Sequence, residues 1–573
     1  MNKDTSFIRD YHEKTKHSEM SVMNSQHYLD WNNRPYPFKI YCNLPTIPLP
    51  TDFSIPSLNA ILAISRLFPQ DKQYNKSNNI NSASVTAAHK SKDFEDKKKL
   101  TLKDLATILF FSGGITREIK HGNHTFYMRA ASATGALYPI EIYIVCKDIS
   151  PELKAGIYHF CPAEFSLINI RKGDYRSALS AAAAAADNQH ILNSPLTIIF
   201  TSLSWRNAWK YQDRSYRHWF WDSGVIAANL LAITSSMNIM SRLSMGFVDD
   251  EVDRLLALEK EKEASIVMAT LEIESSPNFA LESSDTKKEH FSYSDLPPGL
   301  TTIPLSRKEI QFPLIWKTHE NSKLFSKNEA TEWINSGISQ IHNFLNLEKD
   351  IESHRERVLK RQSLPNEYQI SNIPSIGETI LRRGSTRKFA RSSIPFTTLS
   401  SIIYNSTRYI PMDFKKDTDT LIDIYLISND VEGIDSGGYF YNRVNNTLDL
   451  IKDKTTRNLS GYLCLGQSLF SDASVVLFLM SNLNKIIKTL GNRGYRASQF
   501  EAGIITGKIY LSAYAYGIGA SGSTFYDDAA TNFFSPHSEN KNTMIAIGIG
   551  NPAYKARPGK ILPVRLKREQ LIR

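Results

Sequence analysis

The sequence contains little cysteine and no long apolar run. Only four of its 573 residues are cysteines, and no two have the Cys-x-x-Cys spacing of zinc or redox sites. This favours reduced thiols over a disulfide framework, and we predict no metal site. No apolar run approaches the roughly 20 residues of a membrane-spanning helix, and the polar start, Met1–Thr5, has no apolar segment behind it. We therefore expect a cytoplasmic protein that does not bind a membrane.

Blocks of like charge are also missing. The formal net charge is +10, but Lys and Arg are spread along the chain with acidic residues between them. This distribution indicates a solvated surface and is compatible with an anionic ligand, while it does not favour a nucleic-acid partner. The chain is 41% hydrophobic and long enough for two large domains or about three ordinary ones.

The stretch from Arg129 to Pro139 organises the first half of the chain. It reads Arg-Ala-Ala-Ser-Ala-Thr-Gly-Ala-Leu-Tyr-Pro and leads into an apolar, β-branched segment, Ile140–Val145, that predicts a strand. A run of small residues with one glycine lets the backbone approach a flat ligand closely. A tight loop that serves only packing is the alternative.

The other elements of the first half follow from composition and periodicity. Residues 1–57 contain many prolines and predict an extended strap, and the polar tract at 70–99 predicts a mobile insertion. Helices are expected at 57–68, 100–111, 181–186 and 222–238, and strands at 156–160, 165–170 and 196–201. A Ser/Pro/Asp-rich linker is expected at 272–300, followed by one or two charged helices within 325–362.

The second half repeats the order of these signals. The expected elements are a helix leading into 381–389, a strand at 421–427, a hairpin at 437–441 and 447–451, a buried strand at 473–480 and a long helix at 500–516. Arg493-Gly-Tyr-Arg496 matches Arg214-Ser-Tyr-Arg217, and Phe525-Tyr-Asp527-Asp528 matches Phe247-Val-Asp249-Asp250. We therefore predict a tandem duplication. Its parts are an N-terminal domain at 1–271, a linker and helical connection at 272–374, and a C-terminal domain at 375–573.

Five segments taken together resemble a known family. They are Tyr-His-Glu-Lys-Thr-Lys-His-Ser at 11–18, Pro-Phe-Lys-Ile-Tyr at 37–41, Ser-Ala-Thr-Gly-Ala-Leu-Tyr-Pro at 132–139, Lys-Tyr-Gln-Asp-Arg-Ser-Tyr-Arg at 210–217 and Phe-Val-Asp-Asp at 247–250. Both halves resemble the flavin-dependent nitroreductase fold, and more narrowly the SagB/ThcOx-type dehydrogenases. The resemblance covers most of 1–271 and about 375–560.

The resemblance implies an α+β fold. Two tandem nitroreductase-like α/β sandwich domains with mostly antiparallel sheets would form an intramolecular pseudo-dimer, so that the chain is a monomer. FMN would lie between the domains, at one or both of two pseudo-equivalent positions. The implied activity is an FMN-dependent dehydrogenation of a peptide or natural-product substrate, such as azoline to azole, alongside other enzymes of the same pathway.

The family's site residues can be carried over to one complete FMN position. Its phosphate would be bound by Arg382, Ser385 and Arg387, with Arg383 beside them, because guanidinium groups bind phosphate bidentately. Where the family has Arg-Arg-Ser-x-Arg, this sequence has Gly384 in place of the Ser. The alternative for these arginines is a solvated helix end with no ligand. The other expected cofactor-binding residues lie in three segments: Ser132, Thr134, Gly135, Ala136, Ser521, Gly522, Ser523, Lys555 and Arg557.

Lys210 and Tyr211 are the implied catalytic pair. Lys210 would act as a base if burial lowers its pKa, and either residue could orient the substrate. The alternative is a lysine that extends to solvent and a tyrosine that only packs.

The second FMN position has lost the corresponding parts. Ser65-Arg-Leu-Phe-Pro69 stands where the phosphate motif is expected, Arg408–Lys415 replaces the small-residue loop, and Thr489-Leu490 replaces the Lys-Tyr pair. The losses are complementary, so we predict one complete site and one inactive site. Two other functions stay open, namely an NAD(P)H-dependent nitro or quinone reductase and a flavin-free scaffold that binds a modified peptide. Similarity of fold does not decide among the three.

Overall fold

Each half of the chain builds its own seven-stranded sheet. The computed structural model describes residues 2–65, 99–122, 124–273, 300–342, 358–364, 372–560 and 565–566. The first sheet has the order β1-β6-β5-β4-β7-β9-β8 and the second has the order β10-β15-β14-β12-β16-β18-β17. Every neighbouring pair in both sheets is antiparallel. The two orders correspond strand for strand, which confirms two tandem α+β domains of one topology.

Eight of the fourteen strands, β4–β7, β12 and β14–β16, occupy segments where the sequence predicts strands, and the other six were not predicted. The strands of the first sheet are β1 (Thr46–Pro48), β4 (Ile140–Cys146), β5 (Gly156–Cys161), β6 (Ser166–Lys172), β7 (Leu196–Leu203), β8 (Ile239–Ser244) and β9 (Glu263–Ile273). In the second they are β10 (Lys360–Ser363), β12 (Asp423–Ser428), β14 (Gly437–Asn442), β15 (Thr447–Asp453), β16 (Val475–Ser481), β17 (Gly519–Ser523) and β18 (Asn542–Gly550). Two small sheets pair β2 (Ile115–His121) with β3 (His124–Arg129), and β11 (Ile394–Pro395) with β13 (Val431–Glu432).

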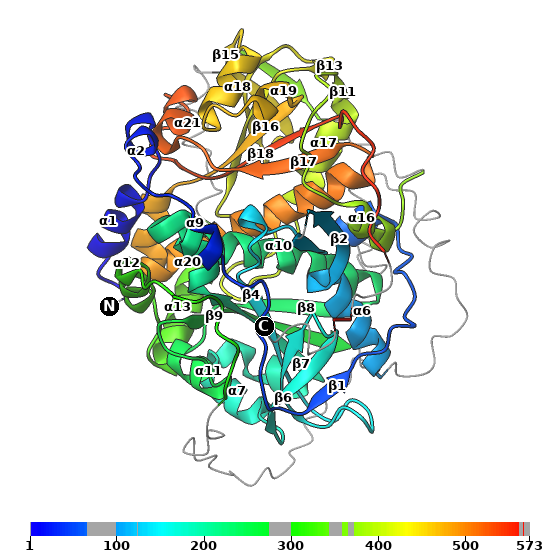
Figure 1. Ribbon diagram of the computed structural model, residues 1–573. Helices are drawn as coiled ribbons and strands as arrows, with labels where there is room; N and C mark the ends of the chain where they lie inside the picture. Colours follow the sequence, from blue (N-terminus) through cyan, green and yellow to red (C-terminus); the bar gives the residue numbers. More distant parts are fainter. Residues whose placement is uncertain are drawn as a thin grey trace.

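Helices cover these sheets and fill the space between them. Those of the first half are α1 (Ser6–Lys14), α2 (Glu19–Met23), α3 (Ala60–Ser65), α6 (Leu102–Gly113), α7 (Arg176–Ala182), α8 (Asn188–Asn193), α9 (Ser204–Tyr211), α10 (Ser215–Ser236) and α11 (Asp249–Leu255). After them come α12 (Pro313–Asn321), α13 (Lys327–Gln340), α16 (Ile376–Arg382), α17 (Phe396–Ser406), α18 (Arg457–Leu463), α19 (Ser468–Asp472), α20 (Leu483–Ala515) and α21 (Asp527–Phe533). Figure 1 shows the second-half sheet above and the first-half sheet below, with α10 and α20 between them.

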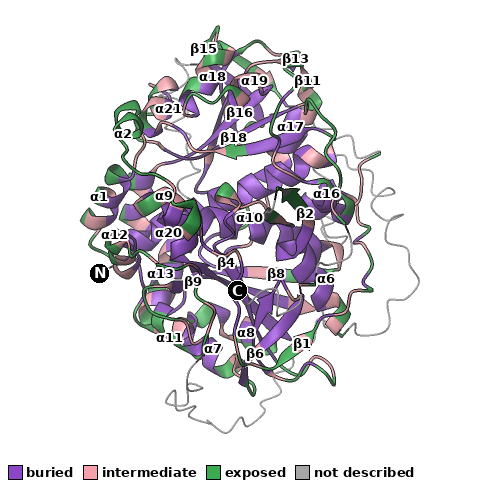
Figure 2. Ribbon diagram, in the orientation of Figure 1, coloured by how far each residue is buried: buried purple, intermediate pink, exposed green. Residues whose placement is uncertain are grey.

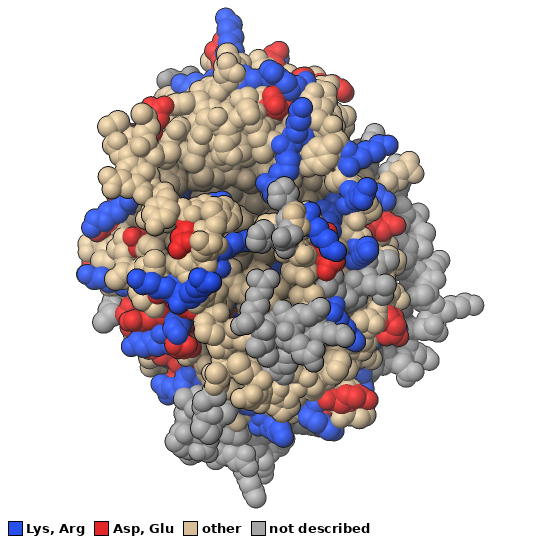
Figure 3. All heavy atoms as spheres, in the orientation of Figure 1, with Lys and Arg blue, Asp and Glu red and all other residues tan. Residues whose placement is uncertain are grey.

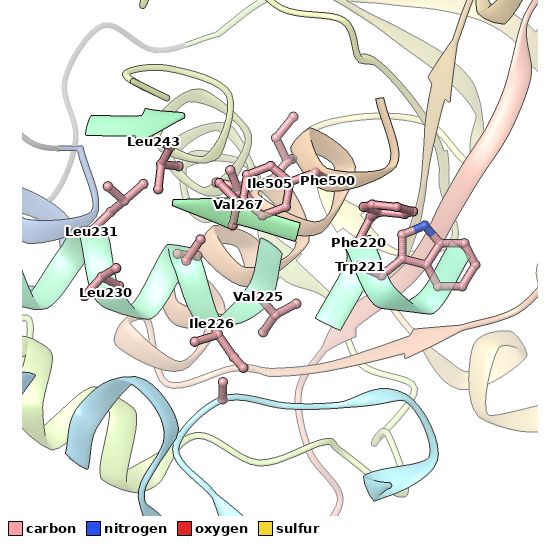
Figure 4. Packing of buried hydrophobic residues seen from close by; sticks show 14 of the residues in the cluster. Phe220, Trp221, Val225, Ile226, Leu230, Leu231, Leu243, Val267, Phe500 and Ile505 are labelled. Carbon is pink, nitrogen blue, oxygen red and sulfur yellow. The ribbon is translucent and has the colours of Figure 1, made fainter. Parts of the chain in front are cut away.

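The centre of the molecule is the contact between α10 and α20. A side chain at Gly224 would place its Cβ 2.5 Å from the carbonyl oxygen of Phe500, and one at Gly503 would place it 2.6 Å from that of Trp221. Glycine is therefore required at both positions so that the two backbones can touch. Large side chains pack on either side of this contact (Figure 4). Both helices are buried along almost their whole length (Figure 2), as expected for a shared core.

Two buried ion-pair clusters tie each half to the other. Arg493 and Arg496 of α20 reach Asp249 in the first half, at 2.6 and 2.8 Å. Arg214 and Arg217 reach Asp527 in the second half, at 2.9 and 2.7 Å. The repeated Arg-x-Tyr-Arg and Asp-Asp motifs thus cross between the halves reciprocally. This is the contact pattern of a twofold dimer, here contained in one chain.

Several predicted elements differ from the structure. The alanine run at 181–186 is not one helix, because α7 ends at Ala182 and Ala183 is extended and bridges to Phe247. Pairing with the segment that carries Asp249 overrides alanine's helix propensity there. The long helices begin earlier than predicted, at Ser215 and Leu483, and α20 is interrupted at Gly491, where the backbone has φ 63°. The interruption lies against Asn2, whose backbone oxygen accepts from Asn492 N at 2.8 Å.

The first residues and the connection between the halves are more ordered than expected. Residues 6–14 and 19–23 are helical, where the sequence predicted an extended strap. The strand β10 lies inside the range expected as a connection, so the second sheet begins before residue 375. Most of the insertion predicted at 70–99, most of the linker at 272–300 and part of the phosphate-motif remnant, 66–69, lie outside the described residues.

The reciprocal clusters predict a stability test. Removing the charge in Asp249→Asn or Asp527→Asn leaves two buried guanidinium groups without their carboxylate, which should cost about 3–5 kcal/mol in the free energy of unfolding. The neighbours Asp250 and Asp528 form more exposed pairs, so Asp250→Asn and Asp528→Asn should each cost at most about 1 kcal/mol. Urea unfolding measures all four. Equal effects from buried and exposed carboxylates would show that the clusters do not hold the halves together.

Candidate functional site

One large cavity lies where the two halves meet. Its volume is about 1300 Å³, and residues of both halves line it. The first half contributes β2, the small-residue loop, the end of α9 and one side of α10, while the second contributes the residues after α16, one side of α20 and β17. Because each half supplies one wall, the site exists only when the halves are packed together.

Most of the residues expected to bind the cofactor or act in catalysis line this cavity. They are Ser132, Thr134, Gly135, Ala136, Lys210, Tyr211, Arg383, Ser385, Arg387, Ser521, Gly522, Ser523 and Arg557. Arg382 and Lys555 are exposed and do not line it. For the arginines the reason is local: Arg382 is the last residue of α16 and points to solvent, whereas Arg383 follows the helix and is buried. Of these two arginines, therefore, only Arg383 lines the cavity.

The small-residue loop forms the first-half wall in an unusual backbone conformation. Gly135 has φ 62° and Ala136 has φ 54°, both in the left-handed region. Asp222 of α10 holds the loop: its Oδ1 accepts from Thr134 N at 2.9 Å and from Thr134 Oγ1 at 2.7 Å. Asp222 is 3% exposed, and burial raises its pKa to about 7 although the hydrogen bonds from Thr134 and Asn207 oppose the shift.

Lys210 and Tyr211 stand together at the end of α9. Burial lowers the pKa of Lys210, and the positive charges of Arg34 and Arg387 lower it further. The Tyr211 hydroxyl lies so close to the loop that a Cβ on Gly135 would meet it at 2.7 Å. On its other side the Tyr211 ring meets His218 edge to face at 4.5 Å. Burial raises the pKa of Tyr211, so its phenol stays protonated and can donate a hydrogen bond.

The second-half wall is fixed by bonds across the interface. Arg383 donates from Nε to Ala130 O at 3.0 Å and from Nη2 to Arg129 O at 2.8 Å, which leaves Nη1 without an acceptor among the described residues. Arg117 of β2 donates to three carbonyls at the C-terminal end of α16 and just after it, those of Leu381, Arg382 and Arg383, at 2.8–2.9 Å. Each arginine thereby anchors a wall of the cavity to the opposite half.

Two tyrosines of α20, Tyr510 and Tyr514, hold the second-half wall in place through their hydroxyl groups. Tyr510 Oη lies 3.3 Å from Ser385 Oγ and accepts from Gly522 N at 2.6 Å. Tyr514 Oη lies 3.3 Å from Thr386 Oγ1. Sequence reasoning missed these tyrosines, and also Asp222, His218, Trp221 and Thr506. A carboxylate at the centre of the apolar helix α10 is the one signal that could have found Asp222, since Asp is seldom buried without a role.

The pseudo-equivalent second position is filled by the chain. Phe414, from the segment that replaces the small-residue loop, packs on Trp333 of α13 with ring centroids 4.9 Å apart, and its backbone closely approaches Gly337. Lys415 is buried and donates to Ile410 O and Asp419 O at 3.2 and 2.9 Å. Leu490, where the first half has Tyr211, is also buried. Trp333 Nε1 also donates to Leu490 O at 2.9 Å, so Phe414, Trp333 and Leu490 are in contact here.

The sequence profile of the nitroreductase family matches residues 87–270 and 380–550, which together exceed half of the chain. The chain belongs to the nitroreductase family. Members of this family are typically flavin-dependent oxidoreductases. This chain contains two copies of the family's domain in tandem. No described helix combines the length and apolar composition needed to cross a membrane.

Comparison with known proteins gives three similarities of different extent. It is 27% identical to a Methanocaldococcus jannaschii protein named as a nitroreductase, over 28% of this chain and 76% of the relative. A crystal structure of an Anabaena variabilis protein, also named as a nitroreductase, covers 96% of this chain and all of its own at 23% identity, with a TM-score of 0.68. That likeness shows a shared fold over both halves. The Escherichia coli McbBCD microcin synthetase complex with truncated pro-MccB17 matches 33% of this chain and 73% of its own at 16% identity, and its TM-score of 0.27 carries no argument.

The raised pKa of Asp222 predicts a pH-dependent stability difference. Its folded pKa, about 7, lies above the ordinary value of 3.8, so its favourable contribution is full at low pH and is lost as pH rises through 7. Asp222→Asn cannot ionise. Its free energy of unfolding, relative to the unsubstituted protein, should therefore rise by roughly 2–3 kcal/mol between pH 5 and pH 8. Urea unfolding at both pH values measures this, with Asp528→Asn as a control for loss of one charge. A difference that is the same at both pH values would contradict the buried, titrating carboxylate.

Proposed function

We propose that this nitroreductase binds one FMN in the cavity between its halves and works as a dehydrogenase of the SagB/ThcOx type. The observation that carries the proposal is the composite cavity. The arginine and serine expected to bind phosphate line one wall, the expected Lys-Tyr pair and the small-residue loop line the other, and the pseudo-equivalent position is filled. The substrate we propose is a peptide or natural product whose azoline ring is oxidised to an azole.

The residues present fit a flavin nucleotide. Arg383 Nη1, Arg387 and the hydroxyl of Ser385 are suited to the phosphate, since they provide permanent charge and short donors. The left-handed loop at Gly135 allows the backbone to lie close to a flat ring.

FMN, when bound, supplies the group that accepts or gives a hydride. The protein's part is to place the substrate carbon and to move a proton. Lys210 fits the proton acceptor, because its lowered pKa raises the fraction of neutral amine. Tyr211, which stays protonated, orients the substrate by donating a hydrogen bond. The loop held by Asp222 keeps Tyr211 and the cofactor wall in one arrangement.

The flavin content and its phosphate clamp test the proposal first. Purified protein should show a flavin absorption spectrum with one FMN per chain. Arg383→Ala with Arg387→Ala should weaken FMN binding about a hundredfold or more, because each charge-assisted phosphate contact is worth roughly 1.5–3 kcal/mol. Arg382→Ala, which removes the exposed neighbouring arginine, should leave binding nearly unchanged. Two FMN per chain would refute the single site, and equal loss in both variants would refute the clamp.

Lys210 is tested by separating binding from turnover. Lys210→Ala should keep the bound flavin and its colour but lose roughly 10²–10⁴-fold in dehydrogenase rate, the usual contribution of a general base. The readouts are flavin absorbance and product formation from an azoline-containing peptide. Turnover equal to that of the unsubstituted protein would show that Lys210 is not the general base. Rapid NAD(P)H oxidation with a nitro or quinone acceptor, without azoline turnover, would instead favour the reductase, and protein that stays colourless with added FMN would favour a peptide-binding scaffold.

A further inference from the structure

The charges that line the cavity do not balance. Eight lining residues are basic and two, Glu118 and Asp222, are acidic. Three of the basic groups, Arg117, Arg129 and Arg383, are held by backbone carbonyl oxygens. The other five are Lys120, Lys210, Arg387, Arg557 and Lys560. None of the eight forms an ion pair with a carboxylate of a described residue.

Cations that are buried elsewhere in the chain have carboxylate partners. Lys39 pairs with Glu263, Arg206 pairs with Glu141, and both reciprocal clusters have an aspartate at their centre. In the cavity, the buried Arg129 and Arg383 are held by backbone carbonyls, whereas the remaining cations are half-buried or exposed and keep their charge toward the open space. A cleft lined mainly by charges of one sign attracts a ligand of the opposite sign.

The cofactor alone does not supply enough negative charge. A phosphate monoester carries about two negative charges at neutral pH, which Arg383 and Arg387 can balance. The volume of about 1300 Å³ also exceeds the roughly 300–1,000 Å³ that suffices for a drug-sized ligand. Room is thus left over on the side of the cavity formed by β2 and the C-terminal segment, where Lys120, Arg557 and Lys560 outnumber the single carboxylate of Glu118.

That side carries Lys120 and Lys560 on adjoining backbones. Lys560 N donates to Thr116 O at 2.9 Å, and Gly559 N donates to Leu381 O at 2.7 Å, so the C-terminal segment is fastened to both β2 and α16. Both lysine side chains are exposed at the cavity. Figure 3 shows blue side chains along the seam between the two halves on this face of the molecule.

We propose that the substrate is an anion whose carboxylate groups lie against Lys120 and Lys560 while its reacting ring lies at Lys210. This inference rests on the proposed function, because it concerns the remainder of the same cavity. The carboxylates can belong to acidic side chains of a peptide or to a small dicarboxylic acid, and the recognising chemistry is the same for both. The lysines act by charge, so affinity must fall as ionic strength rises.

The test compares three probes on FMN-loaded protein by calorimetric titration at low salt. The first is the blocked peptide Gly-Glu-Gly-Glu-Gly, the second its Gln counterpart and the third glutarate. We expect the Glu peptide to bind about tenfold or more tightly than the Gln peptide. Glutarate binding as tightly as the Glu peptide would support a small-acid substrate, and weaker glutarate binding would support a peptide. Equal binding of the Glu and Gln peptides would overturn the inference.

Matched double variants locate the effect. Lys120→Gln with Lys560→Gln should remove most of the preference for the Glu peptide and leave FMN content unchanged. Lys147→Gln with Lys172→Gln removes the same charge from exposed positions that do not line the cavity, and should keep the preference. If both double variants lost the preference for the Glu peptide equally, the preference would come from net charge, and the proposed site at Lys120 and Lys560 would be wrong. Should the protein bind no FMN, the proposed function fails, while the same titrations on flavin-free protein still decide whether the cavity selects carboxylates.

Discussion

The fold depends on two carboxylates that each neutralise a pair of arginines from the other half. Asp249 and Asp527 are almost fully buried, and their arginines hold the pKa of both carboxyl groups far below the usual range. A buried pair of this kind adds little net stability compared with apolar packing, but breaking it is costly. Its value is specificity: the two halves can pack in only the arrangement that satisfies both clusters.

That arrangement also decides where the cavity lies. Gly224 and Gly503, seven residues after Arg217 and Arg496, bring α10 and α20 into backbone contact. Neighbouring side chains of the same helices, such as Asp222 and Tyr510, then face the space between the halves. The N-terminal residues reinforce this geometry, because His12 O accepts from Arg217 Nη2 at 2.9 Å and His17 N donates to Asp527 Oδ2 at 2.8 Å. The segment from Asn2 to His17 therefore belongs to the interface between the halves.

The duplication left the two pseudo-equivalent positions with different contents. Asp222 and Glu501 occupy matching places on α10 and α20, and both accept from a threonine hydroxyl and a backbone amide. At Asp222 this arrangement shapes an open loop beside a cavity, whereas at Glu501 it supports a segment in which Phe414 and Lys415 fill the space. A single chain can let one position close in this way, because one half can change without changing the other. A homodimer cannot, since both of its sites have the same sequence.

The sequence by itself determined the duplication, eight of the fourteen strands of the two large sheets and thirteen of the residues that line the cavity. Apolar alternation, the order of the motifs and the small-residue loop are local signals. They can be recognised in the sequence without knowing how the chain packs. Only the tertiary structure decided which of two adjacent arginines faces the cavity, because the turn after α16 buries Arg383 and exposes Arg382. The tertiary structure also explains why α7 ends within the alanine run. The backbone bridge between Ala183 and Phe247 outweighs the helix propensity of alanine there. The contacts of Asp222 with Thr134 and of Tyr510 with Ser385 join residues 88 and 125 positions apart, and sequence spacing carries no information about such contacts.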